Sequence, residues 1–324
     1  MAFPNVSDIV ATTIENRSKK IADNVTKNNA LLARLKQRGR VRTFSGGRII
    51  TEELSFAENG NAGFYSGYDV LPIQPQDVIT YAQYDIKQAA CPVSVSGLEK
   101  LQNAGPEQMI DLLSARMEVA ESTMMNLISG GIYSDGTGYG GKEITGLNSA
   151  VPAVATASQT NTYGGINRTN WAFWRSKFVD EGGYTTMIAD MNAMWASLVR
   201  GMDRPDLIVM DSLAWSEYVG KLQAQQRFSS MEGDAKAGFG FPSVKFMDAD
   251  VVLDGGIGGF GGENSAYFLN TKYLSFRPHA DRNFVPLTPG KRVSINQDAE
   301  VQIMAWAGNL TCSGAQFQGR LLFD

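Results

Sequence analysis

The spacing of apolar residues predicts one long helix over residues 106–129. Apolar side chains recur there every three or four positions, so they would form a single stripe along the helix; they are Ile110, Leu113, Met117, Ala120, Met124, Leu127 and Ile128. Pro106 suits the first turn, and Gly130-Gly131 suits the end. About 24 residues would give a length of about 36 Å. A methionine-rich stripe at this spacing is typical of a helix that faces a core.

A long hairpin is predicted before this helix. Residues 42–86 contain two strand-like runs on either side of the turn signals Asn59-Gly60 and Gly63. The apolar members of the hairpin are Ile49, Ile50, Leu54, Phe56, Phe64, Tyr65, Tyr68 and Val70. An isolated two-stranded hairpin is marginally stable in water. We therefore expect its apolar side to be covered, either by the chain's own body or by a neighbouring subunit.

The rest of the chain shows patterns of both helices and strands. Further helices are predicted at 8–36, 171–178, 187–198 and 212–228, the last with Ser212 as its N-cap. Strands are predicted at 83–97, 205–211, 244–254, 265–278 and 299–313. This mixture, with a β-rich end, predicts an α+β or mixed α/β protein. A length of 324 residues favours about two packed units.

Charge is distributed unevenly along the chain. Residues 1–42 contain nine Lys/Arg and three Asp/Glu, whereas the remaining residues contain 20 basic and 30 acidic side chains. A basic arm on an acidic body can bind nucleic acid or the acidic body of another copy. The alternative is a basic helix that is simply solvated.

Two glycine-rich segments match the pattern G-x-G-x-x-G, at 136–141 and 256–261. A dinucleotide-binding loop of this kind follows a strand and opens a helix, so that backbone N–H groups face the phosphates. The first segment instead follows the long helix, and the second is followed by a strand pattern. Chance matches are expected in a chain with 34 glycines. A nucleotide site is therefore disfavoured.

Other catalytic or metal-binding patterns are weak. His279 is the only histidine, and the chain contains neither C-x-x-C nor G-x-S-x-G. Asp248, Asp250 and Asp254 could hold a cation, but they lack the spacing of an EF-hand, and a loop between strands is favoured. We expect a protein that is not an enzyme, without catalytic residues or cofactor, and leave a metal at the three aspartates open.

In this order, the predicted elements resemble the major capsid protein of tailed bacteriophages, with the Hong Kong 97 type fold. Local phrases resemble it too: GKEITGLNSAV (141–151), RGMDRPDLIVMDSLAWSEY (200–218), SAYFLNTKYLSFRPH (265–279) and INQDAEVQIMAWAGNLTCSGAQFQGRL (295–321). The resemblance covers nearly the whole chain. The order of the elements carries it, because no single motif is diagnostic.

The resemblance implies an α+β chain in four parts. These are an N-terminal arm (1–41), an E-loop hairpin (42–86), a P domain with the long spine helix (87–146 and 271–304) and an A domain (147–270 and 305–324). Within this scheme, the glycines at 130–141 would let the chain turn off the spine helix, because glycine adopts positive φ without steric cost.

The resemblance also implies a function. The chain would self-assemble as hexamers and pentamers into the icosahedral shell that encloses the double-stranded DNA of a tailed phage. Its partners would be other copies, a separate scaffolding protein, a portal protein, a cement or decoration protein, and DNA bound non-specifically, with no membrane. It would be assembled in the bacterial cytoplasm and reside in the virion.

Contacts between subunits are expected in the arm, the hairpin and the segment PLTPGKR (286–292). The expected residues are Arg34, Lys36, Arg38, Arg40, Leu54, Phe56, Phe64, Tyr65, Tyr68, Lys291 and Arg292. Some family members crosslink through a lysine in the E-loop, but no lysine lies between Val41 and Ile86. Three alternatives stay open: an encapsulin-like nanocompartment shell, a soluble nucleotide-binding enzyme, and a tail or baseplate protein.

Overall fold

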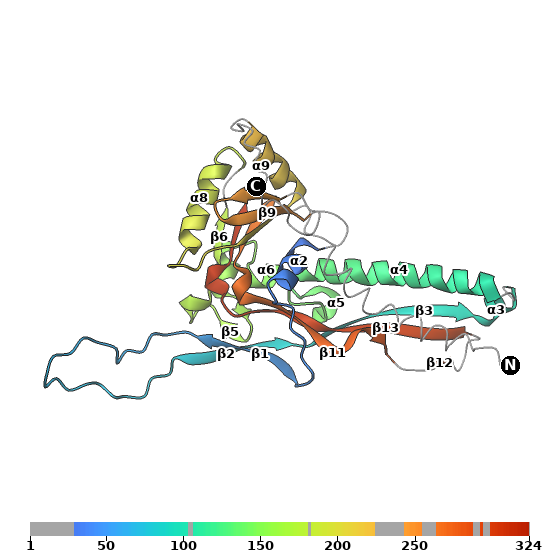
Figure 1. Cartoon of the computed structure of the whole chain (residues 1–324), viewed down its shortest axis with the longest axis horizontal. Helices are drawn as coiled ribbons and strands as arrows, with labels where there is room; N and C mark the ends of the chain where they lie inside the picture. Colours follow the sequence, from blue (N-terminus) through green and yellow to red (C-terminus); the bar gives the residue numbers. More distant parts are fainter. Residues whose placement is uncertain are drawn as a thin grey trace.

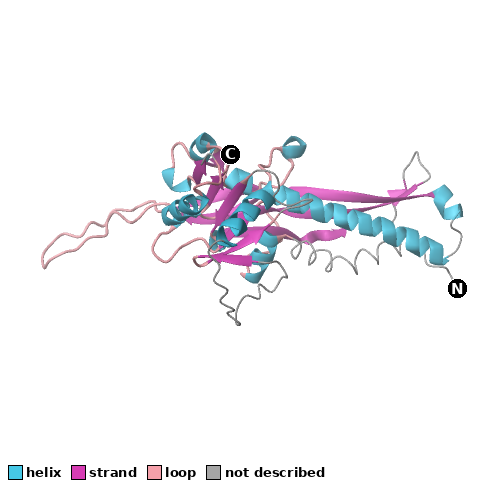
Figure 2. Ribbon diagram, turned by 90° about the horizontal axis from the view of Figure 1, so that it is seen from above, coloured by secondary structure: helices cyan, strands magenta, loops and turns pink. Residues whose placement is uncertain are grey.

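The computed structural model describes residues 29–102, 106–180, 183–223, 243–254, 264–287, 292–293 and 299–323. They form an elongated molecule built on two main sheets. A long helix and its sheet extend toward one end, and a hairpin loop projects from the other (Figure 1 and Figure 2). No helix in these ranges is long and apolar enough to cross a membrane.

The long helix α4 (Pro106–Tyr133) lies along a four-stranded antiparallel sheet (Figure 1). In this sheet β13 (Ala299–Cys312) pairs with β3 (Lys87–Ser96), β11 (Leu274–Pro286) and β12 (Arg292–Val293). Met117 and Ala120 of α4 are buried with Val93 and Val95 of β3. Met124 and Ile128 are buried in the main core. The described part of the predicted stripe therefore faces the core.

The predicted end of this helix is wrong. Helix α4 continues through Gly130-Gly131 to Tyr133. A methyl group on Gly131 would lie 3.2 Å from the side chain of Ile144, so glycine there permits close packing of the returning chain. The chain turns later, where Gly136, Gly140 and Gly141 have φ values of 81°, 69° and 80°.

The second sheet has six strands. Their order is β6 (Lys177–Asp180), β14 (Gly319–Leu322), β10 (Ser265–Leu269), β7 (Leu207–Met210), β9 (Ala249–Leu253) and β8 (Ser243–Phe246). Strand β7 is buried on both faces. Ile208 and Met210 share a core with helices α8 (Met187–Leu198) and α9 (Ser212–Gln223), which lie at the top of Figure 1. Leu207 and Val209 belong to the main core.

The helix predicted at 171–178 is absent. The segment forms only a 3-10 turn, η1 (Ala172–Trp174), and then strand β6. Trp174 is buried and donates from Nε1 to the Tyr163 carbonyl at 2.8 Å. Phe178 pairs in parallel with Arg320 of β14. Pairing with a distant strand has overridden the local helical spacing of the aromatic residues.

Three predicted strands are each divided in the structure. Residues 83–97 form the end of β2 (Ile79–Asp85) and then β3, which belong to different sheets. Residues 244–254 form β8 and β9, joined by a turn at Met247, whose φ is 52°. Residues 265–278 contain β10, the 3-10 turn η2 (Thr271–Tyr273) and the start of β11. Strands β10 and β11 belong to different sheets, so η2 is a crossing between them.

The N-cap of α9 also differs from the prediction. The Asp211 carboxylate, rather than Ser212, accepts the backbone N–H of Ala214 at 2.8 Å. Asp211 precedes the first helical residue, which is the usual capping position.

A second crossing between the sheets runs from β13 to β14 through η3 (Ala315–Phe317). Gln318 links the two crossings, because its amide accepts from the Asn270 N–H at 2.9 Å and donates to the Asn270 carbonyl at 3.1 Å. Strand β13 runs unbroken through the expected domain boundary at 304/305. We propose that the P domain extends to Cys312.

The predicted hairpin consists of β1 (Ile49–Ser55) and β2 (Ile79–Asp85), which pair antiparallel from Ile49↔Asp85 to Ser55↔Ile79. The short elements that remain are α3 (Gly97–Gln102), α5 (Gly138–Gly141), α6 (Leu147–Ala150), α7 (Ala155–Thr160), β4 (Thr162–Tyr163) and β5 (Ile166–Asn167).

The arm is described from Asn29. Helix α2 (Ala30–Gln37) begins there, and the Asn29 side chain caps it by accepting the Leu32 N–H at 3.0 Å. The remainder of the helix predicted at 8–36 lies outside the described residues.

Candidate interaction surfaces

The loop between β1 and β2, residues 56–78, leaves the body of the molecule (Figure 1, left). Three of the predicted contact residues on it are exposed: Phe64 and Tyr68 fully, and Tyr65 to 67%. Val70, Leu71 and Ile73 are exposed beside them, although we did not predict them as contacts. Their apolar character near Pro72 and Pro75 was the available signal. Several large apolar side chains exposed on one segment mark a candidate interaction site.

Local hydrogen bonds shape this loop. The Asn59 side chain accepts the Asn61 N–H at 3.0 Å, and the Asn61 amide donates to the Gln74 carbonyl across the loop at 2.5 Å. The Asp69 carboxylate accepts the Ser66 N–H at 2.8 Å. These contacts hold the two sides of the loop together while leaving its aromatic side chains outward.

The base of the hairpin is anchored to the chain's own body. Leu54 is buried in the main core. The ring of Phe56 lies 5.4 Å from Trp171 and 5.8 Å from Phe173, measured between ring centroids. Both residues were expected at subunit contacts, but here they attach the hairpin to its own subunit. We therefore remove Leu54 and Phe56 from the proposed contact set, and retain Phe64 and its exposed neighbours.

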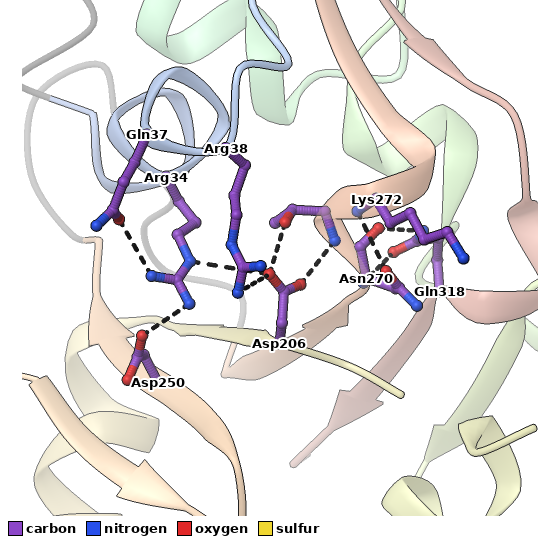
Figure 3. Close-up of polar contacts among 9 residues, drawn as sticks. Arg34, Gln37, Arg38, Asp206, Asp250, Asn270, Lys272 and Gln318 are labelled. Atoms are coloured by element: carbon purple, nitrogen blue, oxygen red, sulfur yellow. Dashed lines mark hydrogen bonds and ion pairs between the residues drawn. The ribbon is translucent and has the colours of Figure 1, made fainter. Parts of the chain in front are cut away.

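The basic residues of α2 meet the acidic body within the same chain (Figure 3). A terminal nitrogen of Arg34 lies 2.9 Å from Asp250 Oδ2, and one of Arg38 lies 3.3 Å from Asp206 Oδ2. Asp206 also accepts from the backbone and hydroxyl of Thr271, at 2.7 and 2.6 Å. The charge asymmetry seen in the sequence thus stabilises the position of α2 on its own subunit.

The other predicted basic residues are placed differently. Lys36 is exposed. Arg40 acts through its backbone, because its carbonyl accepts the Phe276 N–H at 3.0 Å and ties the arm to β11. Arg292 belongs to the short strand β12, and Lys291 lies outside the described residues.

We expect the Arg34 contact to fix the arm helix. Replacing Arg34 with Met leaves the partly buried Asp250 without its cation, at a cost of about 1–2 kcal/mol, between the values of exposed and buried pairs. Hydrogen exchange of the amides in α2 should accelerate about tenfold or more. The exposed Arg48 gives the matched control, Arg48→Met. Unchanged protection of α2 in R34M would contradict the role of this ion pair.

The three aspartates considered for a cation do not form a site. Asp248 pairs with Arg204 at 2.7 Å, Asp250 pairs with Arg34, and Asp254 accepts from the hydroxyl of Tyr133. No group of three metal-ligating side chains occurs among the described residues.

Asp254 is a buried carboxylate at the start of the arm helix. Burial raises its pKa to about 6, although hydrogen bonds from Tyr133 and from the Ala30 N–H act in the opposite direction. Burial likewise raises the pKa of Tyr133. A raised carboxyl pKa means that the folded state binds this proton more tightly than the unfolded state.

The stability of the chain should therefore depend on Asp254 in a defined pH window. Below pH ~4 the Asp254 carboxyl is protonated in both the folded and the unfolded state. As the pH rises to about 6, the unfolded state loses this proton first, and the free energy of unfolding falls by about 2–3 kcal/mol. Asp254→Asn should be more stable than wild type at pH 7.5, with the difference shrinking toward pH 4. Urea denaturation of the two proteins at the two pH values measures this difference in the free energy of unfolding. An equal difference at both pH values would contradict the assignment.

The first glycine-rich segment is a turn rather than a phosphate loop. Tyr139 has a φ of 53° beside the glycines of positive φ, and the Gly141 carbonyl accepts from Lys87 Nζ at 2.7 Å. No helix of more than four residues follows it directly. The second segment, 256–261, lies outside the described residues.

No protein-family model and no curated protein matches the sequence. Solved structures do match the fold. The chain superposes on the capsid asymmetric unit of cyanophage A-1(L) with a TM-score of 0.65, at 18% identity, over 88% of this chain and 90% of that chain. The protein has the Hong Kong 97-like capsid fold.

Two further matches share this capsid fold. The capsid of a native GTA particle gives a TM-score of 0.53 at 13% identity, over 88% of this chain and 89% of that chain. The procapsid of satellite phage P4, whose structure includes a size determination protein, gives 0.52 at 10% identity, over 99% and 92%. The structural neighbours are phage capsid proteins, as the resemblance in the sequence implied.

Proposed function

We propose that this chain is the major capsid protein of a tailed phage, a structural protein rather than an enzyme. It self-assembles as hexamers and pentamers into an icosahedral shell around double-stranded DNA. The observation that carries the proposal is the hairpin loop, which projects from the body of the molecule (Figure 1) and whose apolar side chains between Phe64 and Ile73 are exposed.

The energetics of the loop favour assembly. Phe64 and Tyr68 are fully exposed in the isolated subunit. Burying a large apolar side chain stabilises an interface by about 1.5–3 kcal/mol. A loop that covers a neighbouring copy gains this stabilisation once per subunit, and a closed symmetric shell repeats the contact throughout.

Other partners follow from the same proposal. A separate scaffolding protein directs closure, as the P4 procapsid with its size determination protein supports. A portal protein occupies one position in the shell, a cement or decoration protein binds outside, and DNA is held without sequence specificity. The shell is assembled in the bacterial cytoplasm and becomes the virion capsid.

Electron microscopy of the purified full-length chain, with light scattering on the same sample, tests the proposal. Closed shells, or hexamers and pentamers that close when a scaffolding protein is added, are the expected result. A monomer or dimer that assembles under neither condition would overturn it. Nucleic acid inside particles isolated from infected cells would separate a phage shell from an encapsulin-like compartment filled with protein.

A further inference from the structure

A pocket of 540 Å³ lies beside the edge strand β6, between η1, the end of α8 and η3. Three cationic residues line it, Arg175, Lys177 and Arg200. None of the described residues that line it is acidic. These residues are spread along the sequence and no motif links them, so their meeting could not be predicted from the sequence.

The cations are only partly neutralised by the chain itself. Among the described residues, the ammonium group of Lys177 has no hydrogen-bond or ion-pair partner. Arg200 approaches Glu58 at 3.9 Å, but both side chains are largely exposed, so the pair is weak. The C-terminal end of α8 contributes about half a negative charge. Three formal positive charges exceed that contribution.

One cation is held in place. Arg175 donates from Nε to the Arg168 carbonyl at 2.7 Å and from a terminal nitrogen to the Thr169 carbonyl at 2.9 Å. These two bonds fix the guanidinium plane while leaving its other terminal nitrogen for a ligand. A guanidinium positioned in advance loses little side-chain entropy when it binds an oxyanion.

A buried hydroxyl supplies the second, independent observation. Ser176 lines the pocket and is only 5% exposed, and its Oγ has no hydrogen-bond partner in the part of the chain that the structure describes. The other lining hydroxyls, of Ser158 and Ser197, donate to the carbonyls of Ala155 and Met194. An unpaired buried hydroxyl destabilises the protein unless a ligand satisfies it.

We propose that this pocket is an oxyanion site that binds a phosphate or carboxylate group. Lys177 and Arg200 supply charge, Arg175 supplies a fixed N–H donor, and Ser176 donates its hydroxyl. The group comes either from free phosphate or from an acidic side chain of a second copy. A carboxylate of a second copy suits the excess of 10 negative charges in residues 43–324.

The first experiment does not depend on the proposed capsid function. Unassembled full-length protein is titrated with inorganic phosphate at constant ionic strength set by chloride, and binding is followed by calorimetry and thermal unfolding. Lys177→Met should weaken phosphate binding about tenfold, because hydrogen bonds to charged groups contribute about 1.5–3 kcal/mol. The matched control is Lys245→Met, since Lys245 is exposed on β8, the opposite edge strand of the same sheet.

Ser176→Ala separates binding from a structural role. Without phosphate, this variant should be as stable as wild type or more stable, because it removes an unsatisfied buried hydroxyl. Its stabilisation by phosphate should nevertheless be smaller. Phosphate salts stabilise proteins non-specifically, so only the difference from Lys245→Met counts.

The second experiment identifies the source of the anion. If phosphate slows the assembly of wild type and Lys177→Met assembles poorly without phosphate, the group is a carboxylate of a neighbouring copy. If phosphate binds and Lys177→Met assembles normally, the group is free phosphate. Equal phosphate binding by wild type and Lys177→Met, with normal assembly of the variant, would overturn the site.

Discussion

Replacing Phe64, Tyr65 and Tyr68 together with serine should abolish particle formation without unfolding the subunit. All three side chains are exposed on the loop 56–78, so their loss leaves no cavity in the fold. Each buried aromatic side chain would stabilise an interface by about 1.5–3 kcal/mol, so the triple variant loses about 4–9 kcal/mol per contact. Electron microscopy counts particles, and circular dichroism with thermal unfolding checks the subunit.

A matched triple variant controls for general loss of apolar surface. Val154, Leu213 and Met247 are each 57% exposed and lie outside the loop. Replacing these three with serine should leave assembly close to wild type. Normal particles from the loop variant would remove the loop from the proposed contact. An unfolded loop variant would show that its side chains serve the subunit itself.

Gly146→Ala should destabilise the subunit severely, by about 3 kcal/mol or more. A methyl group at Gly146 would lie 2.5 Å from the carbonyl oxygen of Gly131 and closer still to that of Ile132. Both belong to the backbone of α4, which cannot rotate away as a side chain can. The main-chain approach between the last turn of α4 and α6 therefore requires glycine.

The control for this change is Gly220→Ala in α9. Apart from its chain neighbours and the backbone of its own helix, no heavy atom lies within 4 Å of a methyl group there. Alanine should be neutral or stabilising by about 0.4–1 kcal/mol, because it restricts the unfolded chain and suits a helix. Denaturant unfolding compares the two variants. A Gly146→Ala protein as stable as wild type would mean that α4 and α6 separate easily, contrary to their packing.

The spacing of apolar residues along the chain was sufficient to predict two elements of the fold. The stripe of α4 and the two sides of the hairpin both follow from the spacing of apolar residues. The aromatic residues before β6 show the limit of this reasoning. Phe178 has helical spacing from Trp174, yet it lies in a strand because β14, far along the chain, pairs with it.

Only part of the candidate contact surface could be predicted, because tertiary contacts decide which apolar residues of the hairpin stay exposed. Leu54 and Phe64 are both apolar members of the predicted hairpin, and the sequence does not distinguish them. The tertiary structure does, because Leu54 is buried in the main core and Phe64 is fully exposed. The uneven distribution of charge also predicted that the basic arm meets acidic residues. A count of charges does not show that Arg34 and Asp250 meet within one chain rather than between two copies.

The link between Asn270 and Gln318 has a mechanical consequence. The crossings from β10 to β11 and from β13 to β14 both pass through this pair, and its hydrogen bonds tie these two crossings to each other (Figure 3). Bending between the two sheets at that point would have to break these hydrogen bonds, so the pair stiffens the junction between the sheets. In the proposed closed shell, whose regions differ in curvature, we expect the hairpin loop and the contacts between subunits to adjust more than this junction does.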